Sequence, residues 1–219
     1  MQKDTATYTI SKKGDTLSRK AIPADTASLS DSTYRYFLAY HHVRIFSDSL
    51  QGAADSLYYS FRDSTFRMYY NPVIWTGDNQ LTGDSIYLHT KNKKAEKLEL
   101  RRNAMIVSKA GTDLYDQIKG NNIDGYFLDN KLDRMHVNGS AENIYYPKDD
   151  LGGYLGVNKT SAGMIDIYFK NGELNKVSWR QDVEGSLLPI TQIKPKDMLL
   201  RNFKWEADRR PLSKEELMK

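Results

Sequence analysis

The feature that most constrains this chain is a period-two alternation of apolar and polar residues, which recurs in short stretches along its length. A period of two is typical of β-strands, because successive side chains of a strand point to opposite faces. Polar turns such as Asp129-Asn130 and Asn171-Gly172 separate the stretches into pairs and suit tight hairpins. The sequence therefore predicts a series of β-hairpins. The paired stretches are 52–59 with 66–70, 83–88 with 98–100, 123–128 with 132–137, and 162–169 with 174–179.

Corresponding positions of these hairpins recur about every 30–40 residues, which makes the chain a degenerate repeat with insertions in its loops. Each strand has one apolar face, and no helices are predicted that would cover it. Such a sheet must fold over on itself as a sandwich, roll or solenoid. We predict an all-β fold in three parts. These are a polar N-terminal segment 1–33 with a remnant strand at 7–10, a β domain 34–205, and a C-terminal tail or short helix 206–219 with Ser213 as N-cap.

The composition excludes several classes of protein. Only 39% of the 219 residues are hydrophobic, even with 15 tyrosines counted, and the mean hydropathy is −0.66, so a thick α/β enzyme core is disfavoured. No stretch approaches the ~18–20 consecutive apolar residues of a membrane helix. The absence of cysteine excludes a disulfide scaffold, a zinc ribbon and a thiol nucleophile. Residues 1–5 do not resemble a signal peptide, so for an exported protein we expect the targeting segment to be missing from this sequence.

Catalytic and metal-binding motifs do not occur in the sequence. It contains no Gly-x-Ser-x-Gly elbow, no phosphate-binding Gly-x-x-x-x-Gly-Lys loop and no His-Glu-x-x-His pair. His41 and His42 are adjacent, so on a regular strand they point to opposite faces and do not hold one metal ion together. We interpret them, with His89 and His136, as surface or strand-packing residues. The sequence therefore predicts no catalytic residue, no metal site and no cofactor.

One acidic residue recurs at equivalent places in three hairpins, as Asp55, Asp84 and Asp124. Repeated carboxylates are compatible with a stacked ladder or with calcium sites, as in some β-solenoids. A calcium loop needs several oxygen ligands, however, and each repeat offers one Asp followed at once by Ser or Gly. We therefore interpret these residues as caps of backbone N–H groups at strand starts.

The formal net charge of +4 comes with well-mixed signs, apart from one hairpin that is rich in cations. Binding of single-stranded nucleic acid needs cations and aromatic rings on one exposed face, whereas Glu96 and Glu99 lie within this hairpin. We interpret the hairpin as a solvated edge that discourages sheet aggregation, and we predict no nucleic-acid partner. The cations are Lys91, Lys93, Lys94, Lys97, Arg101 and Arg102.

The apolar faces of a folded sheet either pack directly against each other as a closed core or stand apart and leave a long apolar trough between them. An acyl chain in such a trough gains roughly 0.8 kcal/mol per buried methylene. Methionine and aromatic side chains adapt to chains of different shape. The alternation alone leaves both arrangements open.

Several stretches of this chain resemble the OstA-like family, which includes the LptA-type periplasmic lipopolysaccharide-transport proteins. The likeness is greatest to the Bacteroidota-type branch of the family and extends from about Tyr34 to Trp205. Each stretch is short, but they are distributed along most of the chain. The stretches are 41–59 (HHVRIFSDSLQGAADSLYY), 71–75 (NPVIW), 81–94 (LTGDSIYLHTKNKK), 156–159 (GVNK) and 210–217 (RPLSKEEL).

The resemblance implies an OstA/LptA-like β-jellyroll, or β-taco, built from repeated short antiparallel strands, in a periplasmic, non-enzymatic protein. Its interior would carry the acyl chains of lipopolysaccharide or lipid A between the inner and outer membranes. Edge strands would stack on other Lpt-type jellyroll proteins or on further copies, head to tail. By alternation, the inward, groove-lining residues are Leu57, Tyr59, Met68, Tyr70, Ile74, Ile86, Leu88, Leu98, Leu100, Ile106, Tyr126, Leu128, Met135, Val137, Ile165, Ile167, Val177 and Trp179.

Two other functions stay open at this point. A closed core with exposed edges would make the protein a purely architectural module that binds partners but no ligand. Exposed Tyr and Trp rings would suit a carbohydrate-binding β-solenoid. An enzyme of that kind would need two acidic residues about 5–10 Å apart in an open cleft.

Overall fold

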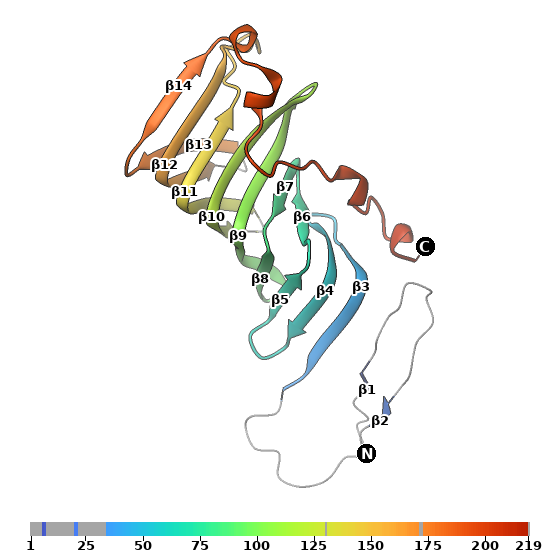
Figure 1. The fold of residues 1–219 in the computed structure, drawn as a ribbon. Helices are drawn as coiled ribbons and strands as arrows, with labels where there is room; N and C mark the ends of the chain where they lie inside the picture. Colours follow the sequence, from blue (N-terminus) through green and yellow to red (C-terminus); the bar gives the residue numbers. More distant parts are fainter. Residues whose placement is uncertain (1–5, 8–19, 22–33, 130, 171–172, 219) are drawn as a thin grey trace.

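Nearly all regular structure is β in the computed structural model, which describes residues 6–7, 20–21, 34–129, 131–170 and 173–218. Strands β1 (Ala6–Thr7) and β2 (Lys20–Ala21) form a two-stranded sheet, and all other strands form one antiparallel sheet of twelve (Figure 1). These are β3 (Tyr36–Phe46), β4 (Gln51–Ser60), β5 (Thr65–Tyr69), β6 (Val73–Thr76), β7 (Asn79–Thr82), β8 (Ser85–Lys91), β9 (Lys94–Gly111), β10 (Leu114–Leu128), β11 (Lys131–Tyr145), β12 (Val157–Lys170), β13 (Glu173–Arg180) and β14 (Glu184–Leu188).

The helices are short and lie after the sheet. Within the described ranges, no helix is long and apolar enough to cross a membrane. The predicted C-terminal helix is a single turn of 3-10 helix, η4. The four 3-10 helices are η1 (Ile190–Gln192), η2 (Pro195–Met198), η3 (Ala207–Arg209) and η4 (Glu215–Met218).

The prediction of an all-β fold of repeated antiparallel strands is confirmed. Each predicted stretch from 52 to 179 lies largely within a strand, but β9 to β12 extend well beyond the predicted stretches, most of all β9. The sequence did not predict β6, β7 or β14. Residues 8–10 of the strand predicted near the N-terminus lie outside the described residues, and Thr7 belongs to β1.

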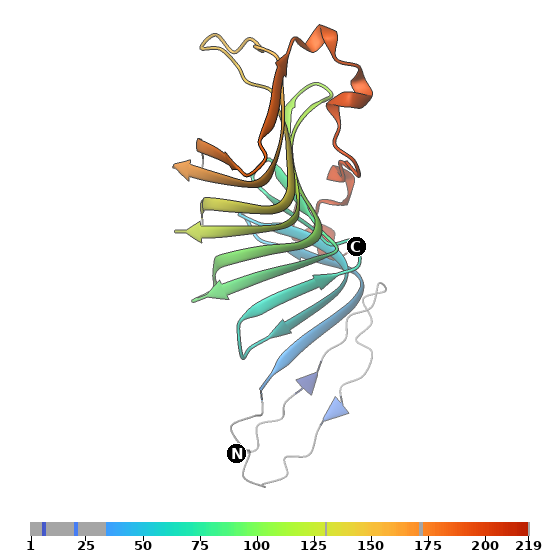
Figure 2. The same ribbon diagram turned by 60° about the vertical axis from the view of Figure 1, so that its left-hand side comes forward.

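The long strands bend along a line that crosses the sheet, which we call the crease (Figure 2). Pairs of consecutive residues with positive φ lie on this line, and register shifts interrupt the strand pairing at the same place, as between Tyr40 and Val43. Left-handed residues redirect a strand, so a repeated pair bends the whole sheet. The pairs are His41–His42, Tyr70–Asn71, Arg102–Asn103, Gly139–Ser140 and Gln181–Asp182.

The crease divides the sheet into two walls. Strands β3, β4 and β9 to β12 run through both, whereas β5, β8 and β13 lie in the first wall and β6, β7 and β14 in the second. Beside the crease the walls approach closely. At Gly120, an added Cβ would lie 2.5 Å from Cγ1 of Val137 in the other wall. Alanines 54, 104, 141 and 162 are buried along the same line. The first wall comprises residues 36–40, 56–69, 85–101, 122–138 and 164–180, and the second wall comprises 43–54, 73–82, 104–120, 141–145, 157–162 and 184–188.

The outer face of the second wall is covered by the segment 189–211, which we call the strap (Figure 1). Phe203 and Trp205 of the strap pack against the ring of Tyr115, with centroids 5.0 and 5.4 Å away. They pack on this face because Met105, Val107 and Ile144 make it apolar.

Three buried glutamines of the second wall, Gln51, Gln80 and Gln117, hold the strap through their side-chain amides. They lie in one row across the sheet with Trp75 and Val107. Gln80 and Gln117 each donate to a strap carbonyl and accept from a strap N–H, as a strand backbone would. The contacts are Gln117 with Met198 O and Leu200 N (both 2.8 Å), Gln80 with Lys204 O and Glu206 N (both 2.7 Å), and Gln51 with the Arg210 guanidinium (2.6 and 3.0 Å).

Candidate functional site

The inner face of the first wall carries two rows of apolar side chains that cross the sheet from β3 to β13. The row beside the crease is buried except for its last residue, Trp179, and the second row lies farther from the crease. Both rows follow from the strand register, since paired residues on neighbouring strands share a face. The first is Ala39, Leu57, Met68, Ile86, Leu100, Ile123, Val137, Ile165 and Trp179, and the second is Phe37, Tyr59, Phe66, Leu88, Leu98, Gly125, Met135, Ile167 and Val177.

The inner face of the second wall changes from apolar to polar along the sheet. Its main row is Ile45, Gly52, Ile74, Leu81, Ile106 and Ile118 from β3 to β10, followed by Asn143, Thr160 and Gly185 on β11, β12 and β14. Trp179 crosses from the first wall and donates its indole N–H to Oδ1 of Asn143 at 2.9 Å. Asn158 accepts hydrogen bonds from Asn143 (3.3 Å) and from Thr160 (3.0 Å). The interior is therefore apolar from β3 to β10 and polar toward β14.

Away from the crease, no backbone pairing joins the two walls in the part of the chain that the structure describes. The turns that connect the strands form two borders away from the crease, which we call the rims. Among the described residues, no hydrogen bond joins a turn of one wall to a turn of the other. Side chains near the rim of the first wall are partly exposed, whereas Ile86 and Leu100 are fully buried. These rim side chains include Phe37, Phe66, Phe127, Leu132 and Phe169.

Most of the residues predicted to face inward do lie in the interior. Tyr59 is in the second row and stacks on Phe66 with ring centroids 4.3 Å apart. Trp179 is in the first row, but it is 37% exposed at the polar end. The others that pack in the interior are Leu57, Met68, Ile74, Ile86, Leu88, Leu98, Leu100, Ile106, Met135, Val137, Ile165, Ile167 and Val177.

The inward orientation predicted for Tyr70, Tyr126 and Leu128 is wrong. Tyr70 is a left-handed residue of the crease and is 71% exposed. On β10, Phe127 packs in the interior, so its two neighbours face the other way. Tyr126 lies on the outer face under the cations of Lys97 and Arg134, and Leu128 is 64% exposed.

The sequence prediction missed several interior residues, above all Phe66, Ile123 and Phe127. Phe66 is two residues from Met68 on β5 and therefore faces the same side, so strict alternation would have predicted it. On β10, residues 126–128 are all apolar or aromatic, so the alternation carries no information about which of them faces inward. A register irregularity between Tyr126 and Phe127 adds to the ambiguity.

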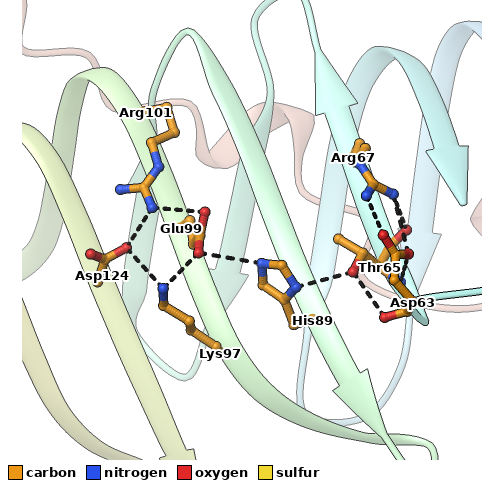
Figure 3. A network of polar contacts seen from close by, with 8 residues as sticks. All are labelled: Asp63, Thr65, Arg67, His89, Lys97, Glu99, Arg101 and Asp124. Atoms are coloured by element: carbon orange, nitrogen blue, oxygen red, sulfur yellow. Dashed lines mark hydrogen bonds and ion pairs between the residues drawn. The ribbon is translucent and has the colours of Figure 1, made fainter. Parts of the chain in front are cut away.

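The outer face of the first wall carries a connected network of ion pairs (Figure 3). Glu99 lies at its centre and accepts from Lys97 at 2.6 Å and from Arg101 at 2.7 Å. Arg101 also contacts Asp124 at 2.9 Å, and His89 Nε2 lies 3.4 Å from Glu99. Burial raises the pKa of Glu99, but the hydrogen bonds from Lys97 and Arg101 outweigh it, so its net pKa is below the usual range. The network therefore stabilises an ionised Glu99.

The three recurring aspartates do not act as backbone caps in the part of the chain that the structure describes. Asp55 lies beside the crease with its carboxylate 3.5 Å from His41 Nδ1. Asp84 accepts from the side chain of Asn103 at 3.0 Å, and Asp124 belongs to the ion-pair network. The repeat of the sequence therefore does not place the three in equivalent environments.

The described ranges contain no group of three or more His, Cys, Asp or Glu side chains placed to hold a metal ion. His41 and His42 are both left-handed residues of the crease. His89 and His136 each face a carboxylate on the outer face of the first wall. The histidines thus lie at the bend and on the outside of the sheet.

The fold defines a class of protein in which one antiparallel sheet, folded lengthwise, encloses an apolar interior. No family model and no curated protein matches this sequence. Among solved structures, the chain is similar to LptH of Pseudomonas aeruginosa, the LptA-homologous periplasmic component of the conserved lipopolysaccharide transport device. The TM-score is 0.48 and the sequence identity 19%, and the match covers 64% of this chain and 95% of that chain.

Proposed function

We propose that this protein is a non-enzymatic carrier of lipopolysaccharide export, which shields lipid A acyl chains in its interior between the inner and outer membranes. The observation that carries the proposal is the apolar interior, whose two walls no hydrogen bond joins at the rims among the described residues. The resemblance of the sequence to the Bacteroidota-type branch of the OstA-like family supports the same function and a periplasmic location.

When an acyl chain enters the interior, apolar contacts between side chains of the two walls are replaced by apolar contacts with the acyl chain. Because no described hydrogen bond ties the rims together, separating the walls between β3 and β10 breaks only side-chain packing, whereas at the polar end it also breaks the Trp179–Asn143 hydrogen bond. An acyl chain that replaces those contacts keeps the walls dry and adds roughly 0.8 kcal/mol for each methylene removed from water. Binding and release then need no chemical step within this chain.

The acyl chains fit the β3–β10 part of the interior, where both walls are apolar. At the β11–β14 end, Asn143 and Thr160 both donate hydrogen bonds to the side-chain oxygen of Asn158. An acyl chain that broke these bonds would leave polar groups unpaired. The anionic head group stays outside at the rims, where its charges remain in water.

The test compares two neighbouring residues of β10 that face opposite ways. Phe127 packs against the interior near the rim, and Leu128 is exposed. A carboxylate in the interior opposes acyl burial, so Phe127→Glu should weaken lipid A binding by at least tenfold, while Leu128→Glu should bind as the wild type does. The measurement is binding of fluorescent lipid A, with mass spectrometry of lipid that co-purifies from cells.

Circular dichroism of each variant controls for folding, and Phe37→Glu at the other end of the rim provides a second interior variant. Equal lipid A binding by Phe127→Glu, Phe37→Glu and the wild type, all with the same β spectrum, would rule out the interior as the binding site.

A purely architectural module is the second candidate, and the buried state of the row beside the crease favours it. Ile86, Leu100 and Val137 are 0% exposed, which a permanently closed core also requires. A wild-type protein that assembles with partners and neither binds lipid A nor carries co-purified lipid would establish this alternative.

A further inference from the structure

An alternating row of cations and tyrosines crosses the outer face of the first wall, on the side opposite the interior. We propose that this row binds an acidic oligosaccharide, a sugar chain that bears carboxylate or phosphate groups. The row, which we call the cation–tyrosine row, follows the strand register from β9 to β13 and consists of Lys97, Tyr126, Arg134, Tyr168 and Lys176.

Cations and rings of the row are in direct contact. The Arg134 guanidinium lies 4.5 Å from the centroid of the Tyr126 ring, with Lys97 on the same ring at 5.5 Å. Lys176 lies 6.0 Å from the Tyr168 centroid. Tyr126 and Tyr168 are two strands apart, which is roughly 10 Å at a strand spacing of about 4.8 Å. An anionic group over Arg134 would therefore have an aromatic ring on each side.

A cavity of about 190 Å³ opens at the middle of this row. Its polar lining suits a hydroxyl-rich ligand better than an apolar one. His136 Nδ1 lies 2.7 Å from Asp166, which also pairs with Arg180, so the carboxylate in the cavity already has partners. The lining residues are Tyr126, Arg134, Met135, His136, Asp166 and Tyr168.

After the ion pairs are taken into account, the remaining charge on this face is positive. The row itself contains no acidic residue, and the carboxylates beside it, Glu99 and Asp124, are paired with Lys97 and Arg101. Within the described ranges, Arg134 and Lys176 make no ion pair, so both are available to an anionic ligand. Arginine binds carboxylate and phosphate oxygens in bidentate geometry, and a ring face packs against the C–H face of a sugar.

Isothermal titration of the full chain tests the proposal with trigalacturonic acid as the acidic oligosaccharide, maltotriose as its neutral counterpart and tripolyphosphate as a sugar-free anion. We expect trigalacturonic acid to bind at least tenfold more tightly than either of the others. Arg134→Ala and Tyr168→Ala should each weaken its binding at least tenfold. Lys109→Ala removes an exposed cation from the second wall and should change nothing.

Absence of trigalacturonic acid binding would overturn the proposal. So would tripolyphosphate binding of equal strength that Tyr168→Ala leaves unchanged, because the face would then act only as a patch of positive charge. The proposal does not rest on lipid carriage: Phe37→Glu, an interior variant, should leave trigalacturonic acid binding intact.

Discussion

Glu99 is a residue whose charge the fold stabilises. Its pKa is lowered in the folded chain, because hydrogen bonds from Lys97 and Arg101 outweigh the effect of burial. Ionised Glu99 therefore stabilises the fold above the usual glutamate pKa, and this contribution is lost as the pH falls through the lowered value. Glu99→Gln should lower the free energy of unfolding by about 1–3 kcal/mol at pH 7, and the difference from the wild type should shrink toward pH 3. Urea unfolding at pH 7, 5 and 3 measures it.

Glu96 of the same strand is the matched control. Its carboxylate is 3.8 Å from Lys91 and mostly exposed, so Glu96→Gln should cost less than about 1 kcal/mol at every pH. A loss of stability in Glu99→Gln that stays constant from pH 7 to pH 3 would contradict the role given to its ionisation.

Glutamine side chains, rather than strand pairing, hold the strap against the second wall. Gln117 is fully buried and makes two hydrogen bonds to the strap backbone, both 2.8 Å long. Gln117→Leu would leave the Met198 carbonyl and the Leu200 N–H without these partners. Each buried group left unpaired costs about 1–3 kcal/mol of folding stability. We expect backbone amides around residue 200 to exchange hydrogen at least tenfold faster, while those of β9 and β10 keep their protection.

Gln192→Leu is the control for this exchange experiment, because Gln192 is an exposed residue of the same segment. Unchanged exchange in Gln117→Leu would mean that the apolar contacts of Phe203 and Trp205 hold the strap without the glutamine row.

At the scale of the whole molecule, the folded sheet has two ends with unpaired edges. In the described structure β3 pairs only with β4, and β14 pairs only with β12. Exposed edges add strands from a partner, and Leu187 of β14 is 57% exposed. If copies stack head to tail, self-association should depend on concentration, and Leu187→Lys should weaken it about tenfold in sedimentation velocity.

Leu151 provides the control for that experiment. It is 96% exposed in the loop between β11 and β12, so Leu151→Lys removes more exposed apolar surface than Leu187→Lys does, without touching an edge strand. Equal weakening by both variants would indicate non-specific apolar association, and a wild type that stays monomeric at all concentrations would exclude stacking of identical copies.

Alternation predicted the interior residues well where apolar residues occupied only every second position of a strand. Leu98, Leu100 and Val137 have polar neighbours on their own strands and lie inside as expected. It failed at residues 126–128, where both parities are apolar or aromatic, and at Tyr70, where a left-handed residue ends the strand. The Gln80 and Gln117 contacts had no local signal, because their partners lie more than eighty residues away.

The sequence by itself determined that this chain is β, where most of its hairpins turn, and most of the residues that leave water, because periodicity and turn chemistry are local properties. Only the tertiary structure decided that the strands bend at a common crease and that the strap covers the second wall. Only the tertiary structure also showed that cations and tyrosines align on the outer face. Those outcomes depend on register between strands far apart in the chain, which no single strand encodes.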